Sequence, residues 1–133
     1  MENCIFCKIV KGEIHSYKIY ENNKAIAFLD LNPLAKGHAL VIPKKHYKNI
    51  FEVDTESLQG IALAIKEVAN LQSKKLGLDG LNIFQANKAI AGQTIFHLHF
   101  HLVPRYEGDS INAWPTSDYA GKNPKEVFKL LTK

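Results

Sequence analysis

Three histidines alternate with apolar residues in one short segment, and this pattern constrains the fold of the chain more than any other. The segment runs from Thr94 to Arg105 and contains His97, His99 and His101. Successive side chains of a β-strand point to opposite faces, so the spacing predicts a strand with three imidazoles on one face. The intervening side chains would then face a hydrophobic core: Leu98, Phe100 and Leu102. Imidazoles aligned in this way either bind a metal or act on a substrate.

The length of the chain predicts a single domain. Its 133 residues (1–133) are enough to bury a core without help from disulfides. No apolar stretch approaches the roughly 20 residues of a membrane-spanning helix. The first residues lack the basic start and apolar run of a secretory signal. We therefore expect a cytoplasmic protein that does not bind membranes and keeps its two cysteines reduced.

The charge of the chain favours a small anionic ligand over a nucleic acid. The formal net charge is +4, which attracts anions through its long-range field. However, Arg105 is the one arginine, and no segment interleaves basic with aromatic residues as nucleic-acid grooves do. A small phosphorylated molecule fits this composition better than DNA or RNA.

The remaining pattern predicts an α+β fold. Apolar segments bounded by turn residues predict strands over residues 17–21, 25–31, 38–43 and 81–86, followed by the histidine strand, which Pro104 should end. A long helix is expected over residues 55–76, capped by Asp54 or Thr55 and ended by Gly77. A short C-terminal helix should run from Pro124 to Leu131, with Asn123 as its cap. This order predicts an antiparallel meander sheet with one long helix.

A tripeptide in front of the histidines adds polar groups suited to a phosphate. Gly92 lets the backbone approach a ligand closely, while Gln93 and Thr94 supply an amide and a hydroxyl. This tripeptide and the alternating histidines together closely resemble the histidine triad family of nucleotide hydrolases and transferases. Three further segments resemble the same family: residues 5–10, 28–33 and 37–46. The resemblance covers about residues 4–106 and leaves the tail, residues 107–133, unmatched.

The resemblance implies a homodimer of compact α+β subunits that binds a purine nucleotide on one face of its sheet. It implies attack by His99 on the α-phosphorus of a nucleoside phosphoramidate or dinucleoside polyphosphate. Water would then hydrolyse the nucleotidyl-histidine and release a nucleotide such as AMP. Covalent catalysis by imidazole is chemically reasonable because it splits one difficult displacement into two easier steps.

The resemblance also assigns roles around His99. His101 and His38 would contact phosphate or assist proton transfer, and Gln93 and Thr94 would hold the phosphoryl oxygens and the leaving group. Asp30 would accept hydrogen bonds from the ribose hydroxyls. The other implied nucleotide contacts are Asn32 and the four apolar residues expected to wall the base: Phe6, Ile9, Phe28 and Leu31. Taken without the resemblance, His38 is a histidine at the start of a strand, Asp30 is a turn residue, and the apolar four are core residues.

One position departs from the family pattern. The family usually carries an amide residue seven positions before the motif glutamine, where this chain has Ala86. Gln85 and Asn87 flank that position, and either can reach the site after a small backbone shift; Asn87 is counted among the phosphate contacts on this basis. The departure leaves the leaving-group preference open.

Cys4 and Cys7 form a C-x-x-C pair that, taken alone, fits a metal site, a redox pair or two buried thiols. A thioredoxin-like role is disfavoured because no βαβ unit precedes the pair. A bacterial branch of the histidine triad family resembles this chain in binding zinc with two cysteines and two histidines. That resemblance implies a structural Zn²⁺ held by Cys4, Cys7, His46 and His97.

Two other classes of function remain open at this point. One is a metalloenzyme with zinc on His97, His99 and His101, although the carboxylates that would support such a site are not evident nearby. The other is a nucleotide-binding regulatory or scaffold protein whose hydrolysis is incidental. In the tail, Trp114 either reaches a partner's pocket, as in some family members, or packs on the core or a dimer surface.

Overall fold

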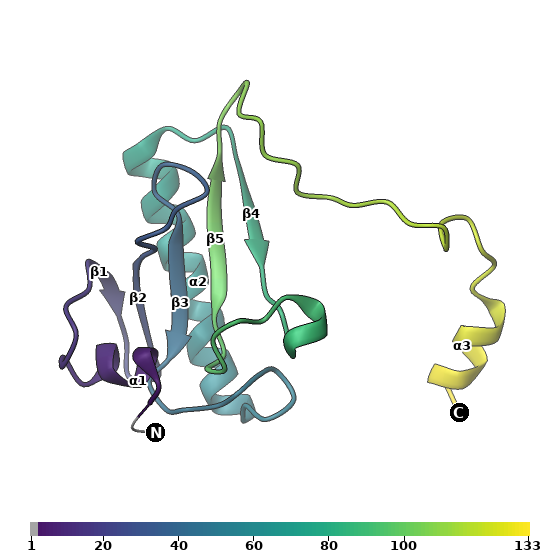
Figure 1. Cartoon of the computed structure of the whole chain (residues 1–133), viewed down its shortest axis with the longest axis horizontal. Helices are drawn as coiled ribbons and strands as arrows, with labels where there is room; N and C mark the ends of the chain where they lie inside the picture. The colour runs from purple at the N-terminus through teal and green to yellow at the C-terminus, as the bar shows by residue number, and fades with distance from the viewer. Residues whose placement is uncertain (1–2) are drawn as a thin grey trace.

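The computed structural model describes residues 3–133, and in this part of the chain a five-stranded antiparallel sheet carries a long helix against one face (Figure 1). The strands are β1 (Lys18–Glu21), β2 (Ala25–Leu29), β3 (Ala39–Pro43), β4 (Gly80–Phe84) and β5 (Phe100–Arg105). The helices are α1 (Ile5–Val10), α2 (Thr55–Leu76), α3 (Lys125–Leu131) and the 3₁₀ turn η1 (Ala89–Ala91). The predicted α+β class with an antiparallel sheet is confirmed.

The order of strands differs in one respect from a simple meander. The sheet order is β1-β2-β3-β5-β4, because α2 carries the chain past one strand position before β4 begins. Sequential pairing holds for β1 to β3 and again for β4 and β5. As a result β5 has a neighbour on each side, and His101 lies opposite Leu40 on β3 and Phe84 on β4.

The long helix α2 begins and ends as its sequence predicts. The Asp54 side chain accepts a hydrogen bond from the Ser57 amide at 2.8 Å, and Gly77 ends the helix with φ of 62°. The helix buries its apolar face against one side of the sheet, and the core there contains Ala25, Ala27, Ala39, Val41, Ile61, Ala64, Val68, Leu98 and Leu102. Each large apolar side chain buried in this way contributes roughly 1.5–3 kcal/mol.

The turn between β1 and β2 is anchored to α2. The Asn22 carboxamide oxygen accepts from the backbone amides of Lys24 at 2.8 Å and Ala25 at 2.9 Å, and its nitrogen donates to the Gly60 carbonyl at 3.0 Å. A Cβ atom at Gly60 would lie 2.4 Å from the Lys24 Cβ. The glycine therefore permits this close approach of helix and turn.

The opposite face of the sheet carries a second apolar cluster and the short helix α1. The cluster contains Phe6, Ile26, Phe28, Leu40 and Ile42. Directly opposed residues on neighbouring strands share a face, so His101 lies on the same side as Leu40. The sequence pattern did not predict α1, which has six residues and is capped by the Cys4 thiol, accepting from the Cys7 amide at 3.4 Å.

The histidine strand is shorter and later than predicted. It begins at Phe100, so His97 and His99 lie in the irregular segment that precedes β5. In that segment the Leu98 amide donates to the Tyr47 carbonyl at 2.7 Å instead of joining the ladder. Pro104 does not end the strand, because β3 pairs with β5 only as far as Leu102 and Pro104 is paired on the β4 side alone.

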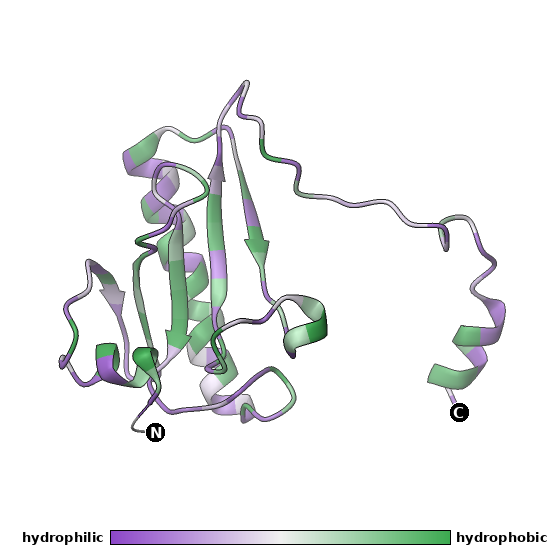
Figure 2. Cartoon of the chain, in the orientation of Figure 1, coloured by the Kyte–Doolittle hydropathy of each residue, from purple (hydrophilic) through white to green (hydrophobic). Residues whose placement is uncertain are grey.

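The tail leaves the sheet after β5, and α3 lies apart from the other elements (Figure 1). Helix α3 begins at Lys125, one residue later than predicted, and Asn123 still accepts from the Lys125 amide at 2.9 Å. Trp114 is 83% exposed and does not pack on the core of its own chain. Apolar residues lie along α3 and are left exposed by the part of the chain that the structure describes (Figure 2). Across residues 3–133, none of the helices has the length and apolarity to cross a bilayer.

Candidate active site

His99 lies just before β5 and is almost fully buried, with 8% of its surface exposed. Its Nδ1 atom lies 2.8 Å from the carbonyl oxygen of His97. Because a carbonyl only accepts, the neutral ring carries its proton on Nδ1 and keeps a lone pair on Nε2. Burial lowers the pKa of His99 and so favours this neutral form. An uncharged imidazole with a free lone pair is the form that a nucleophile requires.

A second group of polar side chains lies beside His99. The His38 Nε2 atom is 3.0 Å from Nδ1 of His101 and 3.5 Å from a carboxylate oxygen of Asp30. The rings of His101 and His99 are 5.0 Å apart between centroids. Burial, with a smaller contribution from the neighbouring histidines, lowers the pKa of His101 to about 4. Burial also lowers the pKa of His38, so both rings are neutral at neutral pH.

Two cavities open on these groups, and Asp30 lines both of them. The first has a volume of about 170 Å³ and is lined by all four residues predicted to wall the base, Phe6, Ile9, Phe28 and Leu31. The second has a volume of about 520 Å³, and its polar lining includes Asn32, His38 and His101.

His99 lies between the two cavities. Its ring centroid is 5.2 Å from that of Phe6, which lines the apolar cavity. It is 5.0 Å from that of His101, which lines the polar cavity. The order of an apolar wall, a carboxylate and imidazoles matches the order of base, ribose and phosphate in a nucleotide.

Gln93, which the resemblance assigns to the phosphoryl oxygens, makes its side-chain hydrogen bonds within the chain in this structure. Its Nε2 donates to the carbonyl oxygens of Lys48 at 2.6 Å and Ile95 at 3.1 Å, and its Oε1 accepts from the Lys88 amide at 2.7 Å. Both amide protons are therefore used, and the buried side chain has no free donor for a phosphoryl oxygen. In this structure Gln93 holds the loop in front of the histidines.

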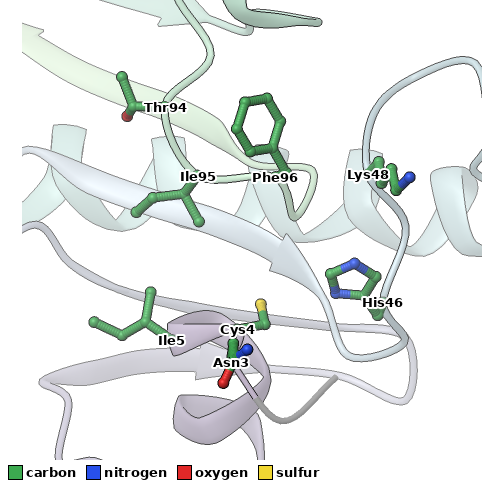
Figure 3. A pocket seen from close by; sticks show the side chains of 8 residues that line it. All are labelled: Asn3, Cys4, Ile5, His46, Lys48, Thr94, Ile95 and Phe96. Atoms are coloured by element: carbon green, nitrogen blue, oxygen red, sulfur yellow. The ribbon is translucent and has the colours of Figure 1, made fainter.

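Thr94 lines a different cavity from His101. This third cavity has a volume of about 600 Å³, and Thr94, Ile95 and Phe96 face Asn3, Cys4 and Ile5 across it, with His46 and Lys48 at one side (Figure 3). The structure therefore places Thr94 in a cavity that Cys4 also lines, and not in the two cavities that share Asp30.

Gln85 and Asn87, which flank Ala86, make different contacts. Gln85 and Ala86 line the polar cavity beside His101. Asn87 instead accepts from the Ile50 amide at 2.8 Å and exchanges two hydrogen bonds with Gln85, at 2.6 and 2.7 Å. The carboxamide of Asn87 thus holds two loops together. Of the two neighbours, Gln85 is the one that reaches the cavity.

Two thiols and two imidazoles converge where α1 meets the histidine segment. The donor atoms of Cys4, Cys7, His46 and His97 all lie within 4.8 Å of one another. The sulfur–nitrogen distances are 3.4 Å from Cys4 to His97, 3.3 Å from Cys7 to His46 and 3.6 Å from Cys7 to His97. A tetrahedral zinc ion with ordinary bond lengths holds sulfur and nitrogen ligands about 3.6 Å apart. The four residues therefore fit zinc in both chemistry and spacing.

A backbone contact orients the first histidine toward these thiols. The His97 Nε2 atom is 2.8 Å from the carbonyl oxygen of Pro43, so the proton lies on Nε2 and Nδ1 is left as a ligand. Burial lowers the pKa of His97 to about 4, which keeps the ring neutral. The ring of His97 thus faces the thiols of Cys4 and Cys7, while its backbone carbonyl orients the ring of His99.

The alternative three-histidine zinc site is not formed. In residues 3–133 the potential metal ligands fall into two groups, one with His97 and the two cysteines, the other with Asp30, His38 and His101. His97 and His101 belong to different groups, and His99 belongs to neither. The reason is that His97 and His99 precede the strand, so the expected alternation does not align the three rings.

Some cavity residues carried no signal in the sequence. Ile14, His15 and Ser16 line the apolar cavity with Phe6 and Phe28. The chain turns back after α1, where the Glu13 amide donates to the Lys8 carbonyl at 2.9 Å. Because α1 itself was not predicted, the return of this segment to the cavity was not predictable either. His15 is exposed, and its ring packs edge-on against Tyr17 with 5.0 Å between the ring centroids.

Comparisons with known proteins agree with this arrangement. Residues 11–108 match the HIT domain model. The adenosine 5'-monophosphoramidase of Saccharomyces cerevisiae is 41% identical over 134 residues, covering 96% of this chain and 82% of the yeast protein. A crystal structure of a HIT family member from Bacillus subtilis has a TM-score of 0.88 and 37% identity, covering 98% of this chain and 93% of that one.

One solved structure similar to this chain contains zinc. The crystal structure of a zinc-bound histidine triad family protein from Mycobacterium smegmatis has a TM-score of 0.79 and 36% identity. The match covers 88% of this chain and 85% of that chain.

Proposed function

The chain belongs to the HIT domain family, and on this premise we propose that it hydrolyses purine nucleoside phosphoramidates or dinucleoside polyphosphates and releases AMP or a similar nucleotide. The observation that carries the proposal is the hydrogen bond from His99 Nδ1 to the His97 carbonyl, which leaves Nε2 free to attack. The named activity of the yeast relative supports adenosine phosphoramidate as the first substrate to test.

The two cavities that share Asp30 give the proposal its substrate orientation. The base enters the apolar cavity between Phe6 and Phe28, and the ribose hydroxyls bind Asp30. One Asp30 oxygen already accepts from the Asn32 amide at 2.8 Å, so the other is the one available to the ribose. The phosphate then lies beside His99 and His101, where the polar cavity begins.

The proposed reaction has two displacements at phosphorus. His99 Nε2 donates its lone pair to the α-phosphorus, the bond from phosphorus to the leaving nitrogen or oxygen breaks, and the leaving group takes up a proton from solvent. Water then attacks the same phosphorus and gives up a proton to solvent, the phosphorus–nitrogen bond to His99 breaks, and the neutral imidazole is regenerated. A neutral nucleophile in a buried site reacts without first losing a shell of strongly held water.

His101 and Thr94 supply the remaining groups of the proposal. The Nε2 atom of His101 makes no hydrogen bond to any described residue, and its side chain lines the polar cavity. It is therefore free to stabilise charge on a phosphoryl oxygen. Thr94, whose side chain lines the third cavity, is assigned to the leaving group on the family resemblance.

Zinc has a structural role in this proposal. Cys4, Cys7, His46 and His97 would supply all four ligands of a tetrahedral ion, so no position remains for a reacting water. Bound there, the ion ties α1 to the segment that carries His99. The same helix carries Phe6 to the wall of the apolar cavity.

We further propose that the protein is a cytoplasmic homodimer. Both cysteines are free thiols, which fits a reducing compartment. Within the described sheet β4 is an edge strand, and Ile83 on it is 49% exposed. The uncovered apolar residues of α3 also call for a partner surface, because isolated helices of seven residues are not stable in water.

The experiment that tests this function is release of AMP from adenosine phosphoramidate and from a diadenosine polyphosphate, by native protein and by His99→Ala. Turnover by native protein that is lost in the variant and persists during brief exposure to a chelator supports the proposal. AMP binding without turnover of either substrate would instead favour a regulatory nucleotide-binding role. Loss of activity on chelation before any unfolding would indicate catalysis by a metal.

A further inference from the structure

A chain of hydrogen bonds connects the backbone of the loop before β3 to the ring of His101. The Leu34 amide nitrogen is 3.0 Å from Nδ1 of His38, and Nε2 of His38 is 3.0 Å from Nδ1 of His101. His38 is 3% exposed, so water does not compete for these contacts. Both histidines line the polar cavity.

The direction of each bond follows from the first donor. A backbone amide only donates, so Nδ1 of His38 accepts and carries no proton. In the neutral ring the proton then lies on Nε2, which donates to Nδ1 of His101. His101 in turn keeps its own proton on Nε2, the atom that makes no bond within the described chain. His99 has the opposite tautomer, because its Nδ1 donates to a carbonyl.

We propose that His38 is a positioning residue: anchored by the Leu34 amide, it fixes His101 as the Nε2–H tautomer, so that His101 presents a neutral hydrogen-bond donor to the phosphoryl group while His99 presents a lone pair. This inference rests on the proposed function for the identity of the group bound. The rings of His99 and His101, with centroids 5.0 Å apart, thereby become an acceptor and a donor. The His97 carbonyl sets the first tautomer, and the Leu34 amide sets the second through His38.

The neutral state of His38 is a requirement of this arrangement. A protonated ring would direct an Nδ1–H against the Leu34 N–H, and both groups would lose their partner. Burial disfavours the charged form of His38 and outweighs the carboxylate of Asp30, which lies 3.5 Å away and favours that form. Within the loop the Asp30 amide donates to the His38 carbonyl at 3.0 Å, and the His38 amide donates to Ala35 at 3.1 Å. These bonds hold the Leu34 amide in place.

Asp30, His38 and His101 also have the spacing of a cation site. The tautomer of His38 decides whether this group binds a cation or orients His101. Asp30, His38 and His101 bring their ligand atoms within 4.8 Å of one another. A cation on Nε2 of His38 would displace the proton to Nδ1, where the Leu34 amide lies at 3.0 Å. Binding a cation would therefore break the bond that orients the ring. The chain of hydrogen bonds from Leu34 through His38 to His101 keeps this bond and leaves only the Nε2–H of His101 free for a ligand.

The direct test is imidazole nitrogen spectroscopy of the full-length, zinc-loaded protein. Two-bond ¹H–¹⁵N correlation spectra distinguish a proton on Nδ1 from one on Nε2. We expect His38 and His101 as Nε2–H tautomers and His99 as the Nδ1–H tautomer. An Nδ1–H tautomer at His101, or a charged His38 at neutral pH, would overturn the proposal without any variant. So would a second equivalent of Zn²⁺ that shifts the signals of His38 and His101.

Two substitutions at the same position extend the test. His38→Phe keeps a ring but removes both nitrogens, so His101 should become a mixture of tautomers, and kcat should fall roughly 10- to 100-fold with little change in KM. His38→Gln retains an amide that can donate to Nδ1 of His101, and it should restore the single tautomer and part of kcat. A drop in kcat in His38→Phe with the His101 tautomer unchanged would contradict a positioning role. Because the spectra require no substrate, the tautomers can be confirmed even if the protein turns over none of the nucleotides tested.

Discussion

The carbonyl oxygen of His97 lies 2.8 Å from Nδ1 of His99, while the ring of His97 points to the thiols of Cys4 and Cys7. One residue therefore contributes its side chain to the metal cluster and its backbone to the proposed nucleophile. Any change that moves His97 is expected to alter both sites. Under the proposed function, zinc held by this cluster would therefore influence catalysis through His97 without contacting the substrate.

The position of Leu98 between these two histidines can be tested by truncation. Its side chain is fully buried in the core beneath α2. We expect Leu98→Ala to lower the free energy of unfolding by about 2–5 kcal/mol, through lost transfer energy and the cavity left behind. Denaturant unfolding measures this change. The control is Leu63→Ala on the outer side of α2, where the side chain is 53% exposed and the effect should stay near about 0.5 kcal/mol.

Removal of zinc should lower thermal stability. At a free zinc concentration 100 times the Kd, binding to the folded state alone adds about 2.7 kcal/mol. For a domain of this size that corresponds to roughly 10 °C in Tm. Thermal scans of chelated protein with and without added zinc measure the effect, and Cys7→Ser should abolish it. Added Mg²⁺ is the control, because thiolates do not retain it. An equal Tm in all samples would contradict a structural zinc site.

The role assigned to Asp30 predicts discrimination by the sugar. Because its free oxygen is proposed to accept from the ribose hydroxyls, native protein should bind AMP more tightly than 2'-deoxy-AMP. A hydrogen bond to a charged group contributes about 1.5–3 kcal/mol, or roughly 10- to 100-fold in affinity. Asp30→Asn should lose most of this preference in calorimetric titrations. Asp118→Asn, in the exposed tail, should keep it; equal preferences in native protein and Asp30→Asn would refute the assignment.

The pair formed by Arg105 and Asp109 predicts a dependence of stability on acid. Two guanidinium nitrogens donate to the Asp109 carboxylate at 2.6 and 2.9 Å, and Arg105 holds the pKa of that carboxyl well below its usual range. The pair therefore stabilises the fold above the pKa of an unfolded aspartate, near 4, and this contribution is lost as the pH falls below it. Between pH 5 and about 2 the Tm of native protein should fall more steeply than that of Asp109→Asn. Parallel curves would show that the pair contributes nothing.

Periodicity and turn chemistry were sufficient for the regular elements. The caps at Asp54 and Gly77 gave both ends of α2, and the apolar alternation correctly placed Leu98 and Leu102 in the core. The family resemblance supplied the other candidate site residues, including the four whose donor atoms converge as possible metal ligands. Neither source revealed α1, which is too short for a periodic signal and is capped by a thiol.

The sequence failed where side chains bind distant backbone atoms. His97 and His99 leave the expected strand because their rings and the Leu98 amide bond to carbonyl groups of Pro43, His97 and Tyr47. Gln93 looks like a phosphate ligand in sequence, yet its carboxamide is used by Lys48, Ile95 and Lys88. The contacts of His97 with Pro43, Leu98 with Tyr47 and Gln93 with Lys48 join segments far apart in the chain, and no local pattern encodes them.

The most direct measurement is the detection of a nucleotide bonded to His99. Native protein is mixed with adenosine phosphoramidate and quenched at alkaline pH in denaturant, because a phosphorus–nitrogen bond to histidine breaks in acid. Peptide mapping by mass spectrometry then locates the added group. The account predicts one adenylyl group on the peptide that contains His99 and none in the His99→Ala protein. AMP released at an undiminished rate by His99→Ala, with no adduct in native protein at any time, would contradict it.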